Sequence, residues 1–168
     1  MIDTTSLRTA TFALGIGVLL GFAAVAVYLL PLNPSIVSAQ LTFSQEAFAS
    51  VHGQWSPLAR ERFRSHFAWD YGLIAGYALW GHLHGRLAPS IHRLSRHPRR
   101  LVVWLLPLAA CADVMENLLH GRLVDPDQGV AADELYALAG GAASLKWALG
   151  LAFVGLAALA LRRHKNAG

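Results

Sequence analysis

Residues 101–120 read LVVWLLPLAACADVMENLLH, an apolar segment that polar side chains interrupt only in its second half. A helix needs about 20 residues to cross a bilayer, and this segment is long enough to do so. Its acidic, amide and imidazole residues are Asp113, Glu116, Asn117 and His120. Their spacing places them on one helix face, where an acid exposed to lipid costs about 2.5–3.5 kcal/mol. This face must turn toward other helices, so the segment predicts a helical membrane bundle.

Three further segments have the length and apolar character of membrane spans: residues 10–30, 67–87 and 135–161. We therefore expect an all-α fold, a four-helix transmembrane bundle that forms a single domain over residues 1–168. The composition agrees, because only 14% of the residues are charged, against about 25% in typical soluble domains. The first apolar stretch exceeds the core of a signal peptide, about 7–15 residues, so we expect it to remain as a span.

The connection between the first two spans, residues 32–66, contains two helix-start signals. A capping box that begins at Thr42 predicts a short amphipathic helix, which ends at Gly53. We expect this helix to lie in the membrane interface, within the first extracytoplasmic loop. Ser56 followed by Pro57 marks the second start, from which we expect a helix that runs unbroken into the second span.

The distribution of basic residues predicts the orientation in the membrane. The loop over residues 88–100 and the C-terminal tail are basic, whereas the loop over residues 121–134 is acidic. Lys and Arg accumulate in short cytoplasmic loops. We therefore expect a protein of a bacterial-type plasma (inner) membrane with both termini in the cytoplasm. Arg60, Arg62 and Arg64, in the long first connection, argue against this orientation.

Polar side chains of the second and fourth spans should meet those of the third. In the predicted orientation they all fall in the outer half of the membrane, counting about 1.5 Å per residue. Lys146 is then within reach of Asp113 or Glu116 along its flexible stem. We expect one buried, outward-facing polar pocket. Its predicted ligand-binding residues are His66, Asp70, Tyr77, Asp113, Glu116, Asn117, His120, Lys146 and Trp147.

Three acids accompany one lysine in this set, and such an acidic surplus inside a membrane indicates a ligand or proton site. The candidate catalytic residues for acid–base chemistry are Asp113, Glu116 and Asp70, although the pattern leaves open whether the chain is an enzyme. Glu116 and His120 have the spacing of two metal ligands on one helix. However, the sequence contains no HExxH motif, and we expect neither a metal nor a cofactor.

The pattern favours a multi-pass membrane protein that binds an amphipathic or lipid-like small molecule. One alternative is a non-catalytic membrane subunit or scaffold whose buried ion pairs only hold the helices together. Another is a small proton-coupled transporter that acts as a dimer, and Gly17 and Gly21 offer a close-packing face for such a homo-oligomer. The expected partners are the lipid bilayer and a hydrophobic small molecule. Nucleic acid is not expected, because the basic residues flank apolar segments.

The pentapeptide LHGRL occurs twice, at residues 83–87 and 119–123, and each copy closes a predicted span. We interpret Gly85 and Gly121 as helix C-caps, since glycine is the favoured residue just beyond a helix end.

The overall plan is loosely similar to that of the sterol-isomerase-like (emopamil-binding) membrane family. The features that carry the resemblance are four spans with short loops and buried acids, asparagine and tryptophan. The resemblance is architectural and implies only a hydrophobic small-molecule ligand, and no site residues are carried over from that family.

Overall fold

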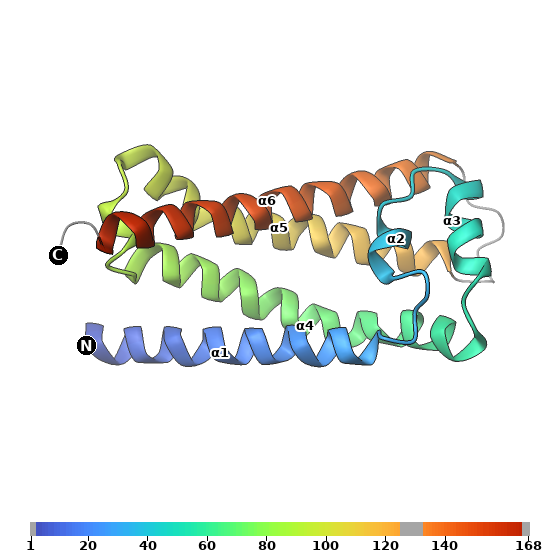
Figure 1. Cartoon of the computed structure of the whole chain (residues 1–168), viewed down its shortest axis with the longest axis horizontal. Helices are drawn as coiled ribbons and strands as arrows, with labels where there is room; N and C mark the ends of the chain where they lie inside the picture. Colours follow the sequence, from blue (N-terminus) through green and yellow to red (C-terminus); the bar gives the residue numbers. More distant parts are fainter. Residues whose placement is uncertain (1–2, 125–132, 166–168) are drawn as a thin grey trace.

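The computed structural model describes residues 3–124 and 133–165, and these residues are all-helical, without a strand. The long helices are α1 (Thr4–Tyr28), α4 (Pro57–Leu87), α5 (Arg96–Leu123) and α6 (Asp133–Lys165). The short ones are α2 (Ile36–Gln40), α3 (Gln45–Gly53) and the 3₁₀ turn η1 (Ile91–Arg93). The helix α5 packs between α4 and α6, and α1 packs mainly on α4 (Figure 1). Within the described residues, α1, α5 and α6 are long and apolar enough to cross a membrane.

The start of α4 is confirmed. Ser56 is its N-cap, and its hydroxyl accepts a hydrogen bond from the Ala59 amide at 3.2 Å. Pro57 occupies the first turn, where its missing N–H has no intrahelical partner to lose. As expected, the helix continues without a break through the predicted second span to Leu87.

The short helix α3 forms and ends at Gly53 as predicted, but its N-cap is Ser44 and not Thr42. The Ser44 hydroxyl accepts from the Ala47 amide at 3.2 Å. The Thr42 hydroxyl instead donates to the Ala39 carbonyl at 2.7 Å, which closes the preceding helix α2. The capping-box interpretation was wrong because two short helices lie end to end here, and Thr42 belongs to the first of them.

The interpretation of the two LHGRL glycines as C-caps is also wrong, because α4 and α5 run on to Leu87 and Leu123. Gly85 is buried against α5, and a Cβ atom added there would lie 2.8 Å from the Val103 Cα atom. The lack of a side chain at Gly85 therefore allows α4 and α5 to pack closely. Gly121 faces open space within the described structure.

Three arginines near the start of α4 donate hydrogen bonds to carbonyl groups at the C-terminal ends of three other helices. The pairs are Arg60 with Gly53 at 3.2 Å, Arg62 with Tyr28 at 2.8 Å and Arg64 with Val124 at 3.1 Å. Carbonyls at a helix C-terminus lack intrahelical partners and carry partial negative charge. These contacts give the three arginines a structural role that does not depend on the side of the membrane.

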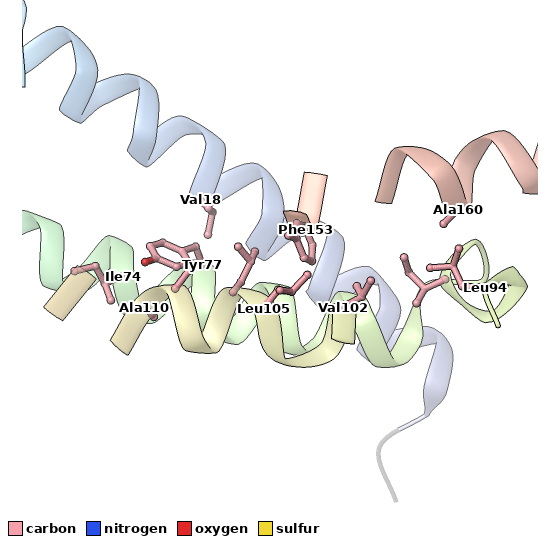
Figure 2. Close-up of a cluster of buried hydrophobic side chains, with 12 residues drawn as sticks. Val18, Ile74, Tyr77, Leu94, Val102, Leu105, Ala110, Phe153 and Ala160 are labelled. Atoms are coloured by element: carbon pink, nitrogen blue, oxygen red, sulfur yellow. The ribbon is translucent and has the colours of Figure 1, made fainter. Parts of the chain in front are cut away.

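Two apolar clusters make up the core. One joins α1, α4, α5 and α6 through side chains such as Val18, Tyr77, Leu105 and Phe153 (Figure 2). The other lies where α2 and α3 cover the bundle, around Phe63. On α5 the buried residues from Val102 to Ala110 belong to the first cluster, and Val124, just after the end of the helix, belongs to the second. The buried polar face of residues 113–120 separates them.

Candidate functional site

Side chains from α4, α5 and α6 meet in a buried group of charges, which we call the acid–lysine cluster: Tyr77, Asp113, Glu116 and Lys146. The Lys146 Nζ atom lies 3.0 Å from Asp113 Oδ1 and 2.5 Å from Glu116 Oε2. The Tyr77 hydroxyl donates to the other oxygen of Asp113 at 2.9 Å. One lysine therefore bridges two acids that are 5% and 1% exposed.

A second polar pair lies one helical turn away. The Asn117 amide donates to Asp70 Oδ2 at 2.7 Å and joins α5 to α4. His120 lies along the same face of α5, with Nδ1 3.8 Å from Glu116 Oε1 and 3.2 Å from the Glu116 carbonyl oxygen. The regular spacing of these residues along α5 produces the arrangement, because each successive polar group returns to the face that α4 and α6 cover.

Aromatic side chains close the end of the bundle next to His120. The ring of Phe48, from α3, lies 5.8 Å from the His120 ring, measured between centroids. Phe63, from α4, lies 6.1 Å from it on another side and is 1% exposed. Both phenylalanines belong to the cluster under α2 and α3. Packed aromatic side chains therefore close the polar face of α5 at the end where His120 lies.

Trp147 lies at the surface beside this cluster, and the Lys146 Nζ atom is 5.5 Å from the centroid of its ring. Its side chain is 43% exposed, and its indole Nε1 lies 3.4 Å from Gln40 Oε1 of α2. Consecutive residues of a helix point in directions about 100° apart, so Trp147 cannot follow Lys146 inward. The structure thus brings together the predicted polar residues of α4, α5 and α6, and it leaves the predicted tryptophan at the surface.

A groove of about 680 Å³, open along one side, lies on the adjoining face of α4, between α4 and α1. We call it the α1–α4 cavity. Its α1 wall consists of Leu14, Gly17, Val18, Gly21, Ala24, Val25 and Tyr28. Its α4 wall consists of His66, Trp69, Gly72, Leu73 and Gly76. The charged side chains pair with one another inside the bundle. Between α1 and α4, Gly17 and Gly72 leave open space, whereas Gly21 and Gly76 lie close to side chains of the opposite helix.

His66 is the one predicted site residue that also lines the α1–α4 cavity. It is 3% exposed, and its Nδ1 atom lies 2.5 Å from the Phe63 carbonyl oxygen. On α4, His66 stands between the face that carries Asp70 and Tyr77 and the face that borders the cavity.

The sequence analysis missed the α4 wall of this cavity. Gly72 and Gly76 repeat the four-residue spacing of Gly17 and Gly21 on α1, and the two pairs border the same space. The signal was present, but such spacing more often marks close packing than a hollow. Among the described residues, no three His, Cys, Asp or Glu side chains are grouped so that they could hold a metal ion.

These features define an all-helical protein with three helices able to cross a membrane and an enclosed cluster of paired charges between its helices. Comparisons of the chain with protein-family models, with curated proteins and with solved structures found no match.

Proposed function

We propose that this chain is a four-span inner-membrane protein that binds a lipid-like amphiphile in the α1–α4 cavity. The cavity carries the proposal. Its volume falls within the range of about 300–1,000 Å³ that is usual for small-molecule sites, and such sites are mostly apolar with few polar groups. Here the walls are aliphatic, aromatic or glycine except for His66. An apolar chain packs against those walls, and a polar group contacts the buried imidazole of His66.

The case for α4 as a fourth span comes from its position. Its 31 residues make it about 46 Å long at about 1.5 Å per residue, more than the bilayer core of about 30 Å. It packs between α1 and α5. The first residue of α1 and the last of α6 lie at the same end of the bundle (Figure 1), which fits an even number of crossings. The polar side chains of α4 are tolerable in a membrane because they pair inside the bundle.

In the proposed orientation both termini are cytoplasmic, and α2 and α3 cover the outer end, with α3 in the membrane interface. Phe48 of α3 is buried against the bundle while Phe43, just before this helix, is 51% exposed, which suits an interfacial position. Most of the acidic loop, residues 125–132, lies outside the described residues.

Labelling of single cysteines in intact cells tests the orientation. Cys111, the one native cysteine, is first replaced by serine. We expect a membrane-impermeant maleimide to react with Gln54→Cys, at the end of α3, and to leave Ser95→Cys, just before α5, unlabelled until the membrane is opened. Both positions are exposed in the fold, so burial does not bias the comparison. Labelling of Ser95→Cys from outside would reverse the proposed orientation.

Binding, rather than catalysis, is the activity that we propose. The candidate catalytic acids Asp70, Asp113 and Glu116 do not line the α1–α4 cavity. They are engaged with Asn117 or Lys146. The same pairing favours one alternative, a scaffold whose ion pairs only hold the helices together. In that case the cavity would be an empty space without a ligand.

Filling the cavity separates the two functions. Gly17 and Gly72 border it, and a Cβ atom at either position meets no heavy atom within 4 Å. We expect Gly17→Leu with Gly72→Leu to fold well, since leucine favours a helix over glycine by about 0.8–1 kcal/mol per position. Gly155→Leu on α6 is the matched control, because that glycine also faces open space but lies outside the cavity.

The readout is the lipid content of each purified protein after organic extraction and untargeted mass spectrometry. The parent and Gly155→Leu should carry a stoichiometric amphiphile that the double leucine variant has lost. Equal lipid content in all three proteins would support the scaffold.

A further inference from the structure

Positive charge from the first turns of α4 lies near the end of the α1–α4 cavity at Tyr28. Among the described residues, Arg60, Arg62 and Arg64 form no salt bridge, and their side chains bond to backbone carbonyls instead. Backbone carbonyls lower the cost of placing a guanidinium group there but do not neutralise its charge. The first turns of α4 carry these three arginines against one acid, Glu61, and therefore present a net positive surface.

The same positive charges also affect the pKa of His52, which lies on α3. Burial lowers the pKa of its imidazole below the usual 6.5, and the neighbouring charges of Arg60 and Arg64 lower the pKa further. A cationic histidine is disfavoured at this end of the bundle, and the same field favours an anion.

Arg62 is the arginine that adjoins the cavity. Its guanidinium carbon lies 5.0 Å from the centroid of the Tyr28 ring, and Nη1 donates to the Tyr28 carbonyl at 2.8 Å. Tyr28 itself lines the cavity, and its hydroxyl lies 2.7 Å from Ser65 Oγ. A guanidinium group has several N–H donors, so one bond to a carbonyl leaves others for a ligand. Arg62 is half-buried, which makes its remaining donors accessible from outside the bundle.

The polarity of the cavity changes along its length. Leu14 and Val18 border one end, whereas Tyr28 and the buried His66 border the other. Leu14 and Tyr28 are about 21 Å apart along α1 at about 1.5 Å per residue. An extended hydrocarbon chain matches that length, with its head at the end that Arg62 borders. His66 lines the cavity at this same end.

We propose that the ligand is an amphiphile with one hydrocarbon chain and an anionic head, a carboxylate or phosphate that Arg62 and His66 bind. This inference rests on the proposed function and adds the chemical class of the head. Arg62 supplies charge and a planar fork of donors, which suit both oxyanions. His66 supplies a polar contact at the point where the chain enters the apolar walls.

Four probes with the same chain test the class of head: oleic acid, oleyl phosphate, oleyl alcohol and oleylamine. Their binding to the delipidated protein in detergent is measured by native mass spectrometry. We expect the parent to bind oleic acid or oleyl phosphate about tenfold more tightly than oleyl alcohol, the usual value of one charge-assisted hydrogen bond. Oleylamine should bind more weakly than the alcohol. The two acids also distinguish a carboxylate site from a phosphate site.

Arg62→Gln should remove the preference for the anionic probes while the alcohol still binds. Arg60→Gln is the matched control, because Arg60 also bonds to helix-end carbonyls but does not border the cavity, and it should keep the preference. If the parent binds acid and alcohol equally, or if Arg62→Gln changes nothing, the head is not anionic and the proposed cavity ligand survives. If the parent binds none of the four probes, the proposed function itself fails. The preference of the parent decides the question even if Arg62→Gln does not fold.

Discussion

Lys146→Met should lower the free energy of unfolding by about 3–5 kcal/mol, the usual cost of removing one partner from a buried ion pair. The reason is geometric. Lys146 lies within 3.0 Å of both Asp113 and Glu116, and no other lysine or arginine among the described residues bonds to either acid. Its loss leaves two carboxylates buried side by side. Methionine keeps the length of the side chain, so the change measures charge and hydrogen bonding rather than volume.

Equilibrium unfolding in detergent micelles measures this effect, with Arg162→Met as the control on the same helix, where the side chain is exposed. The control should change the free energy of unfolding little. Adding Asp113→Asn and Glu116→Gln to Lys146→Met should restore much of the loss, because the unpaired charges are then removed. A Lys146→Met protein that unfolds like its parent would show that the lysine does not hold the acids in the folded state.

The second large effect concerns the two LHGRL glycines, where the same local sequence should respond in opposite directions. Gly85→Ala should destabilise the fold by about 1–3 kcal/mol, the usual cost of overpacking. The new methyl group meets the backbone of Val103, with the Cα atom 2.8 Å away, so α4 and α5 must separate. Gly121→Ala should stabilise the fold by about 0.8–1 kcal/mol, because alanine favours a helix and no described residue lies within 4 Å of the new methyl group.

The two alanine variants are each other's control, since the substitution and the flanking residues are the same. Thermal unfolding of both variants and of the parent measures the two changes in stability. Similar shifts of the melting temperature in the two variants, whether up or down, would contradict the close contact between α4 and α5 at Gly85.

The sequence predicted those parts of the structure that depend on periodicity and local chemistry. The helix start at Ser56 and Pro57 needs only a capping side chain and a residue without an N–H. The contact of Lys146 with the acids of α5 was predicted because three helix faces with polar residues have to meet somewhere inside the bundle. Counted depths placed all of these residues in the same half of the membrane, within reach of the flexible lysine side chain.

The α1–α4 cavity could not be predicted in the same way. Periodicity says which face of a helix turns inward, but the width of the gap between two faces depends on the helix crossing and on every side chain in it. From the sequence alone, glycines at positions 17 and 72 are equally compatible with close packing of two helices and with an open space between them. The same limit produced the incorrect C-caps, because Gly85 and Gly121 have identical neighbours and differ only in what α5 or open space places opposite them.

Photo-crosslinking tests the central claim, a ligand chain between α1 and α4, most directly. The probe is a fatty acid with a diazirine in its chain, and the adducts on the membrane-embedded protein are located by peptide mass spectrometry. We predict that they concentrate between Leu14 and Tyr28 and between His66 and Gly76, and that Gly17→Leu with Gly72→Leu removes them. Adducts spread evenly over outward-facing residues such as Leu151 of α6, and unchanged in the filled variant, would contradict the account.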